Sequence, residues 1–372
     1  MMMRTVSALA ILAAAVVATT AAPSLAKMAP AREAPARATA PAKTLVFFDN
    51  DFLGPGQSNI QALIPLLRNP DVAVIGLGVV TGDQWATEAT AHALRFLEIA
   101  RRTDVPVHKG ASMPLIRSQA EMKTWETRFG AIAFKGAWNV PRPGRTYHPD
   151  QPDLIPPMPE GVPKTPASRT DAVQALIAAV RAHPGQVVVI AAGPLTNIAM
   201  AIRIAPDLPH LAKEIVFEGG RIDSQTDRVT GNADYATDFN FLFDPEAAHI
   251  VLTAPWQRIT VLENVTSQAR MSPEVLARID DSKPVGAYIR RYARRNQPMW
   301  DELVTAVAVD RSLVTKDVVA RMDVDLAQGA SYGRAQVWSE DMAPKQGEQP
   351  VHIVLSVDAD RFIDTYVAQA SK

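Results

Sequence analysis

Residues 44–51 read TLVFFDND, a run of β-branched and aromatic residues that stops abruptly at Asp49. Apolar residues at helical spacing follow over 60–67, and residues 72–80 (VAVIGLGVV) form a second uninterrupted apolar run. Residues 87–100 then return to a helical pattern. Buried strands that alternate with helices are typical of a parallel sheet covered by helices on both faces. The sequence therefore predicts an α/β fold with a mostly parallel sheet.

The same alternation returns in the second half of the chain. We predict strands at 186–191, 214–217 and 259–262, and helices at 171–182, 198–204 and 245–252. The tail from about 321 to 366 mixes short strands with a final helix at 358–366. The pattern over 44–372 fits one large α/β domain or two smaller ones, and the resemblance described below implies a single domain.

Residues 141–166 hold nine prolines and almost no periodicity, which predicts a long irregular loop. Such a loop is either a surface excursion or a lid over a site, because long loops in compact domains are often functional. The pattern alone leaves both interpretations open.

The composition of the 372-residue chain is that of a globular protein, with 47% hydrophobic and 21% charged residues. The formal net charge of -1 offers no basic excess for nucleic acid and favours a small neutral ligand. Cysteine is absent, which excludes disulfides, thiolate nucleophiles and cysteine-based zinc sites.

The N-terminus has the pattern of a secretory signal over residues 1–26. Arg4 precedes an apolar run at 8–22, and small residues stand before the expected cleavage after Ala26. The run is shorter than the roughly 20 residues of a membrane-spanning helix. The Ala/Pro-rich stretch 27–43 is predicted to be a disordered spacer. We expect an exported protein, periplasmic or secreted, that is free of the membrane once the signal is removed.

Polar segments follow four of the predicted strands. In open α/β sheets, ligands bind outside the carboxyl ends of the strands. The segments at these positions are Asp49-Asn50-Asp51, Thr81-Gly82-Asp83, Ala192-Gly193-Pro194 and Glu218-Gly219-Gly220. Because three of the four carry carboxylates, the sequence predicts an acidic site at this edge.

Asp49 and Asp51 flank Asn50 directly after the first strand. Alternate residues of an extended chain point the same way. Two carboxylates placed so repel each other unless a cation lies between them or one takes up a proton. Calcium and magnesium prefer such oxygen ligands. The alternative is turn chemistry, because Asp and Asn also favour strand ends and helix caps.

Two further groups of residues are candidates for the site. Asp301, which follows Trp300, opens an apolar helix and is either a site carboxylate or an N-cap. Asp238 and Asn240 are two residues apart and come shortly after Asn232. A carboxylate and an amide with this spacing suit the hydroxyl groups of a sugar.

Taken together, these segments resemble the inosine–uridine-preferring nucleoside hydrolases over about residues 44–366. The most specific stretches are 103–110 (TDVPVHKG), 192–200 (AGPLTNIAM) and 237–248 (TDFNFLFDPEAA). The resemblance implies a Rossmann-like domain that hydrolyses the N-glycosidic bond of a nucleoside or related N-riboside, and that forms a homo-oligomer. It also implies a calcium ion at the strand ends, which binds the attacking water.

The resemblance assigns roles to individual residues. It makes Asp51 a calcium ligand and the general base that acts on the water. It also places Asp49 in the catalytic site as the neighbour of Asp51. The other metal ligands that it implies are Asn59, the backbone carbonyl of Ala192, and Asp301. The ribose-binding positions that it implies are Asn232, Asp238 and Asn240. Asp238 stands where the family usually has Glu, so its reach is shorter by one methylene group.

The sequence departs from the family pattern at the start of the first helix. Ser58 and Asn59 occupy the places of two further aspartates, after a turn lengthened by 54–56. Losing charged ligands weakens calcium binding. Asp83 replaces the usual Asn and Glu218 the usual Met, which adds carboxylates that can contact substrate. The hypothesis is a redistributed acidic site that still binds metal.

Trp300 stands where many members have the histidine that protonates the leaving base. Indole has no acid chemistry near neutral pH, but it stacks on a base or sugar; Trp300 is either such a contact or a core residue. The runner-up function is a non-catalytic exported protein that binds nucleosides or ribose. The changed helix start and the missing histidine favour it, whereas Asp51 and Asp301 favour the hydrolase.

Overall fold

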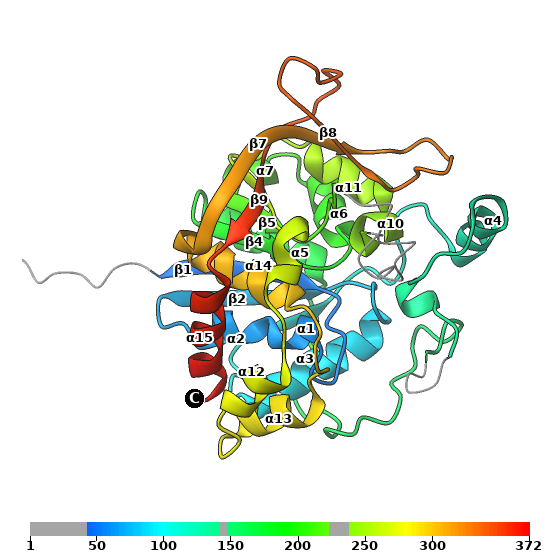
Figure 1. The fold of residues 1–372 in the computed structure, drawn as a ribbon. Helices are drawn as coiled ribbons and strands as arrows, with labels where there is room; N and C mark the ends of the chain where they lie inside the picture. Colours follow the sequence, from blue (N-terminus) through cyan, green and yellow to red (C-terminus); the bar gives the residue numbers. More distant parts are fainter. Residues whose placement is uncertain (1–42, 142–146, 223–237) are drawn as a thin grey trace, which may run out of the picture. The chain divides into compact units, whose positions relative to one another are not determined.

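A nine-stranded sheet organises the chain in this computed structural model, with the order β3-β2-β1-β4-β5-β6-β9-β7-β8 (Figure 1). The structure describes residues 43–141, 147–222 and 238–372, which all fall within one compact unit. The strands are β1 Thr44–Asn50, β2 Val72–Val79, β3 Val107–Lys109, β4 Val187–Ala191, β5 Glu214–Phe217, β6 Ile259–Val261, β7 Val314–Val324, β8 Ala335–Trp338 and β9 Pro350–Val357.

The pairing from β3 across to β9 is parallel throughout. At the far edge, β7 pairs antiparallel with both of its neighbours, β9 and β8. The mostly parallel sheet predicted from the sequence is therefore confirmed. The order of the first six strands is that of a Rossmann-like sheet, in which the strand order reverses between β1 and β4.

Helices cover both faces of the sheet. One face packs against α5 (Ala172–Ala182), α6 (Thr196–Ile204), α7 (Leu208–Leu211) and α11 (Pro245–Leu252). The other packs against α1 (Ser58–Gln61), α2 (Leu63–Leu67), α3 (Ala86–Ile99), α12 (Pro273–Arg278), α13 (Pro284–Tyr292), α14 (Trp300–Val309) and α15 (Ala359–Ala370). None of the helices in the described part of the chain has the length and apolar character needed to cross a bilayer.

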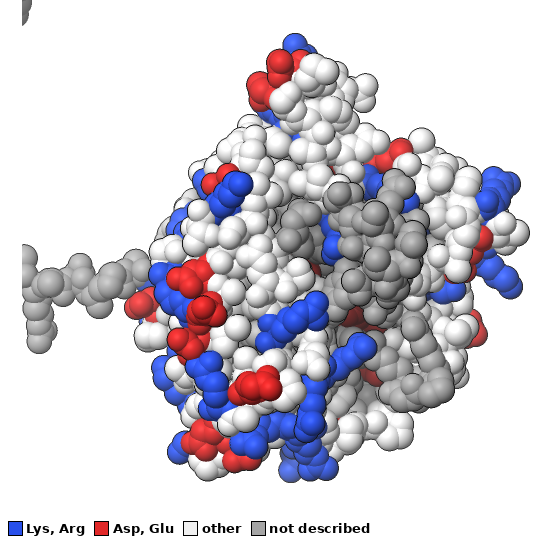
Figure 2. Space-filling view, viewed as in Figure 1, with Lys and Arg blue, Asp and Glu red and all other residues white. Residues whose placement is uncertain are grey.

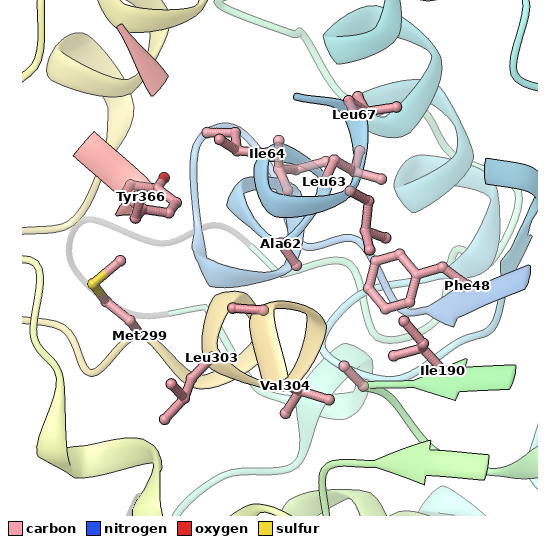
Figure 3. Packing of buried hydrophobic residues seen from close by; sticks show 14 of the residues in the cluster. Phe48, Ala62, Leu63, Ile64, Leu67, Ile190, Met299, Leu303, Val304 and Tyr366 are labelled. Atoms are coloured by element: carbon pink, nitrogen blue, oxygen red, sulfur yellow. The ribbon is translucent and has the colours of Figure 1, made fainter. Parts of the chain in front are cut away.

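Alternation along β1 builds the two cores. Val46 and Phe48 belong to one buried cluster, and Phe47 to the other. Figure 3 shows Phe48 and Ile190 on the sheet side of the first cluster, with α2 and α14 packed nearby. This packing fixes the start of α14, which carries Asp301, against the helices that follow β1.

Most predicted elements occur close to the expected bounds, with 214–217 and 245–252 unchanged. The helix predicted at 60–67 is instead split into α1 and α2. Pro65 lacks the N–H that would bond to the carbonyl of Gln61, which accounts for the interruption. The first part of β7 was not predicted, because its side chains from Thr315 to Val319 are exposed and lack an apolar alternation.

The described part of the Pro-rich stretch, residues 147–166, is fastened along α3. The indole Nε1 of Trp85 donates to the carbonyl of His148 at 2.7 Å. Further along, Arg95 Nε donates to the carbonyl of Glu160 at 2.8 Å. The carboxylate of Glu98 accepts from the backbone N–H groups of Lys164 and Thr165 at 2.6 and 2.7 Å. The stretch is thus a docked segment beside the loop that follows β2.

Replacing Glu98 with Gln should loosen this segment. Burial alone raises the pKa of Glu98, but hydrogen bonds from Thr165, Arg95 and Lys164 outweigh it and lower the pKa to about 2. Its stabilisation is therefore full above the unfolded pKa near 4 and is lost as pH falls toward 2. Hydrogen bonds to charged groups contribute about 1.5–3 kcal/mol. We expect roughly tenfold faster hydrogen exchange at the amides of residues 164 and 165.

The exposed Asp360 on α15 provides the matched control, because Asp360→Asn removes a carboxylate that touches nothing in this segment. Equal protection of residues 164 and 165 in wild type and Glu98→Gln would show that Glu98 does not hold the segment.

Candidate active site

The polar segments after β1, β2, β4 and β5 lie side by side, because these strands are neighbours in the order β2-β1-β4-β5. Asp49 pairs in register with Gly78 of β2 and Ala191 of β4. The N–H of Ala192 donates to the carbonyl of Asp49 at 3.0 Å, and that of Glu218 to Ala191 at 2.9 Å. The predicted meeting of these strand ends is confirmed, and it falls at the point where the strand order reverses.

Asp51 is buried at the centre of this edge. Its Oδ1 accepts from Nδ2 of Asn59 at 2.7 Å, and its Oδ2 from the backbone N–H of Asp83 at 2.7 Å. Burial raises the pKa of Asp51 well above its ordinary range, and the charges of Asp83 and Asp301 raise it further. Asp51 therefore belongs to an acidic cluster whose members repel one another.

Asp301, near the start of α14, belongs to the same cluster although it is 251 residues from its partner Asn50 in sequence. Nδ2 of Asn50 donates to Oδ2 of Asp301 at 2.8 Å, and the backbone N–H of Asp301 donates to Oγ of Ser58 at 3.0 Å. Burial is the main cause that raises the pKa of Asp301 to about 7, with the charge of Asp83 adding to it. Met299 occupies the N-cap position of α14, so the N-cap interpretation of Asp301 is wrong.

Two glycines leave room for Asp51. A Cβ on Gly82 would lie 2.1 Å from Oδ2 of Asp51 and 2.6 Å from Cδ of Pro194. A Cβ on Gly193 would lie 3.0 Å from the backbone nitrogen of Asp51. The walls around this carboxylate therefore need residues without side chains.

Asp49 points to a different part of the edge. Its Oδ2 accepts from Nδ2 of Asn197, on α6, at 2.8 Å. Its Oδ1 is buried and has no hydrogen-bond partner within the described residues. Burial raises the pKa of Asp49 to about 7, although the bond from Asn197 opposes this.

Asp49 and Asp51 have different hydrogen-bond partners in this structure. The charges of Asp83 and Asp301 are among the causes that raise the pKa of Asp51. β1 ends at Asn50, so Asp51 follows the strand rather than belonging to it. Asp49 supports the edge from the α6 side, while Asp51 faces α1 and the loop after β2.

Asp238 and Asn240 hold the turn after β5. Asp238 caps α10 (Phe239–Phe243), where its Oδ1 accepts from the N–H of Phe241 at 3.2 Å. Its Oδ2 accepts from the N–H groups of Gly220 and Arg221. Nδ2 of Asn240 donates to the carbonyl of Glu218 at 3.2 Å. These residues thus lie at the predicted edge and are engaged with its backbone.

The remaining candidate residues of the site differ in how deeply the structure buries them. Glu218 is buried at the end of β5, and Asp83 is half-buried after β2. Trp300 is half-buried as the first residue of α14, so it is not a core residue. Asn232 lies outside the described residues.

Glu302 is a buried carboxylate that the sequence analysis missed. The hydroxyl of Ser58 donates to it, and the same hydroxyl accepts from the N–H of Asp301. Burial raises the pKa of Glu302 well above its ordinary range. The sequence offered one signal for this role, because Glu302 stands beside Asp301 at the start of a helix that is otherwise apolar. Glu302 brings a carboxyl group to Ser58, a position from which a carboxylate was expected to have been lost.

A pocket of about 250 Å³ opens beside the cluster. The turn 53–57 forms one side, Gln84, Trp85 and Glu88 a second, and Ala137, Tyr147 and His148 the rest. The N–H of Ala137, which lines the pocket, donates to the carbonyl of Gly82 at 2.8 Å, and Gly82 lies against Asp51, so the pocket adjoins the acidic cluster.

The donor atoms of the cluster suit a hard divalent cation. Among the residues described, no three Asp, Glu, His or Cys side chains come together as a metal-binding group. The predicted ligand set needs only two carboxylates, those of Asp51 and Asp301, with the Asn59 amide and the Ala192 carbonyl. Buried carboxylates that repel one another fit such an ion, because calcium and magnesium take oxygen ligands.

Replacing Asp301 with Asn should stabilise the metal-free chain at high pH. Because the pKa of Asp301 is raised to about 7, its ionisation opposes folding, and this cost grows as pH rises from about 4 to 7. The unfolding free energy of Asp301→Asn minus that of wild type should therefore be larger at pH 8 than at pH 5. Urea unfolding in a chelator measures both values. A difference that does not change with pH would contradict the repulsion.

An acidic cluster at the switch point of a Rossmann-like sheet, with a pocket beside it, is typical of an enzyme or binding protein for a small molecule. The family model described as inosine-uridine preferring nucleoside hydrolase matches residues 46–364. The chain belongs to this family, as the sequence resemblance predicted.

Two relatives and one solved structure illustrate the similarity. The inosine-uridine preferring nucleoside hydrolase of Leishmania major is 27% identical over 323 residues, covering 83% of this chain and 92% of the relative. Probable uridine nucleosidase 2 of Arabidopsis thaliana is 31% identical over 239 residues, covering 64% and 65%. A purine-preferring ribonucleoside hydrolase from Gardnerella vaginalis superposes with a TM-score of 0.67 at 21% identity, covering 88% and 98%. The structural likeness confirms the fold.

Proposed function

We propose that this chain hydrolyses the N-glycosidic bond of a nucleoside or related N-riboside. The observation that carries the proposal is the buried cluster in which Asp51, from the end of β1, meets Asp301, from α14. It occurs in a chain whose family match extends over residues 46–364.

The chemistry assigned to the cluster follows from its charges. Asp51 accepts the proton of the water that attacks C1′ of the ribose, because a raised pKa makes a carboxylate a better base. Asp301 and Asp83 place negative charge where the oxocarbenium-like transition state develops positive charge. Glu218, Asp238, Asn240 and Trp300 are the proposed contacts to the substrate, with Asn232 beyond the described residues.

The family is metal-dependent, and calcium is the ion proposed here. Asp51, Asn59, Asp301 and the carbonyl of Ala192 would hold it. A bound divalent cation would offset the repulsion between the carboxylates and make water easier to deprotonate. Calcium should therefore raise the melting temperature of wild type more than that of Asp301→Asn. Equal shifts in both proteins would mean that calcium binds elsewhere.

The substrate class rests on the printed names of the relatives, which refer to inosine, uridine and purine or pyrimidine ribonucleosides. Figure 2 shows Lys and Arg interspersed with Asp and Glu on the visible face, which agrees with a small ligand rather than a polyanion. A non-catalytic nucleoside- or ribose-binding protein is not favoured, because relatives covering most of the chain are hydrolases.

The test is incubation of the purified protein with calcium and inosine, uridine or p-nitrophenyl riboside. Wild type should release free base or p-nitrophenolate together with ribose, and Asp51→Ala should not. The control Asp360→Asn, which alters an exposed carboxylate on α15, should behave like wild type. Tight binding of nucleosides without turnover would instead support the binding protein.

Export and assembly are further proposals. The pattern of residues 1–26 supports secretion to the periplasm or beyond, and residues 1–42 lie outside the described part of the chain. N-terminal sequencing of the exported protein should begin at Lys27. The family resemblance also supports a homo-oligomer, which light scattering of the purified protein would test.

A further inference from the structure

The pocket beside the acidic cluster is the right size for one heterocycle. Its volume of about 250 Å³ is below the roughly 300 Å³ at which pockets for drug-sized ligands begin. A ribose placed over Asp51 and Asp301 would leave the base as the part that enters a neighbouring pocket of this size.

The lining of the pocket suits a planar polar ring. Trp85 and Tyr147 supply aromatic surface, and Gln57, Gln84 and Glu88 supply amide and carboxylate groups. Aromatic faces stack on heterocycles, while amides and carboxylates pair with ring nitrogens and their N–H groups. The pocket therefore has the chemistry to hold a leaving base beside the ribose.

His148 has a fixed place in this lining. Its carbonyl accepts from the indole Nε1 of Trp85 at 2.7 Å and from the N–H of Gln151 at 3.0 Å. These bonds use the backbone of His148 and fasten it to the start of α3. His148 is half-buried and is one of the residues that line the pocket. Its backbone bonds thus hold His148 in the wall of the pocket proposed for the base.

A leaving base needs a proton. When the C1′–N bond breaks, its electron pair passes to the base nitrogen, which is then protonated, while the attacking water passes a proton to Asp51. Among the described residues that line the pocket, His148 is the side chain of the type that ordinarily exchanges protons near neutral pH. The indole of Trp300, at the start of α14, donates no proton near neutrality.

We propose that His148 donates a proton to the nitrogen of the leaving base, and so acts as a catalytic residue of the riboside hydrolysis proposed above. Imidazolium loses one proton and the base gains one, while Asp51 takes one from water. Solvent later returns a proton to His148. The sum is riboside plus water to ribose plus free base, and this inference rests on the proposed function.

Other titratable groups lie around the pocket, but they are not the proposed proton donors to the leaving base. Glu88, on α3, and Tyr147 also line it. Behind Glu88, Nε2 of His92 lies 3.8 Å from Oε1 of Glu88, and Nδ1 of His92 is bonded to Glu160. His92 is only 3% exposed and both ring nitrogens face carboxylates, so it does not reach the ligand space. Glu88 is left as an acceptor for N–H groups of the base.

The test compares two kinds of leaving group in His148→Gln and His148→Ala. p-Nitrophenolate departs without a proton, whereas the bases of inosine and uridine require one. General acid catalysis contributes about 10²–10⁴-fold, so kcat on nucleosides should fall by that factor. Hydrolysis of p-nitrophenyl riboside should stay close to wild type.

His210→Gln is the matched control, because His210 is exposed at the end of α7. It should leave both reactions unchanged. Equal losses on both substrate types in the His148 variants, or no loss on either, would overturn the proposal. If wild type cleaves p-nitrophenyl riboside through Asp51 and the His148 variants behave in this way, only the role of His148 fails. If wild type cleaves no riboside, the proposed function fails, and the role of His148, which depends on it, fails as well.

Discussion

Asp51→Asn should lose about 10²–10⁴-fold in kcat on every riboside that wild type cleaves, because the amide cannot accept the proton of the attacking water. The same change should make the metal-free protein more stable at pH 8. Burial and the charges of Asp83 and Asp301 raise the pKa of Asp51, so its ionisation opposes folding there. Activity and stability should therefore move in opposite directions.

Steady-state kinetics with calcium and urea unfolding in a chelator measure the two effects. An Asn side chain still offers an oxygen to Asn59 or to the N–H of Asp83, so the fold should persist. A variant that is both inactive and much less stable would indicate a structural role for Asp51. A fully active variant would remove Asp51 from the mechanism.

Gly82→Ala should reduce activity almost as severely without touching an ionisable group. The new Cβ would come within 2.1 Å of Oδ2 of Asp51 and 2.6 Å of Cδ of Pro194. No unbonded atoms tolerate such a distance, so Asp51 or its loop must shift. A misplacement of this kind can cost about 10²-fold in rate. Overpacking typically costs about 1–3 kcal/mol, so the protein should remain folded.

Gly329→Ala is the control for this prediction, because a Cβ there meets nothing within 4 Å. It should leave kcat and the melting temperature close to those of wild type. If Gly82→Ala were as active as wild type, the geometry of Asp51 would not matter to turnover and the site would lie elsewhere.

Local patterns predicted the features of this chain that depend on neighbours in sequence. The apolar runs that became β1, β2, β4 and β5 need burial on both faces, so a parallel sheet followed. Because the carboxyl ends of such strands meet at one edge, the sequence also predicted the meeting of Asp51, Asp83 and Glu218.

Features that depend on distant packing could not be predicted in this way. The hydrogen bonds from Asn197 to Asp49 and from Asn59 to Asp51 depend on how α6 and α1 pack against the strand end, which no local pattern encodes. The Ser58–Glu302 bond joins residues that are 244 apart in sequence, and the packing of α14 on α1 and α2 brings them together. The docking of His148 on Trp85 has no periodic signal, since the Pro-rich stretch has no regular elements.

The most direct test of the central claim is a crystal structure of the protein soaked with calcium and ribose. We predict one calcium ion in contact with the carboxylates of both Asp51 and Asp301, and the sugar beside it. Carboxylates of Asp51 and Asp301 that lie in separate pockets, with calcium bound to neither, would contradict the account.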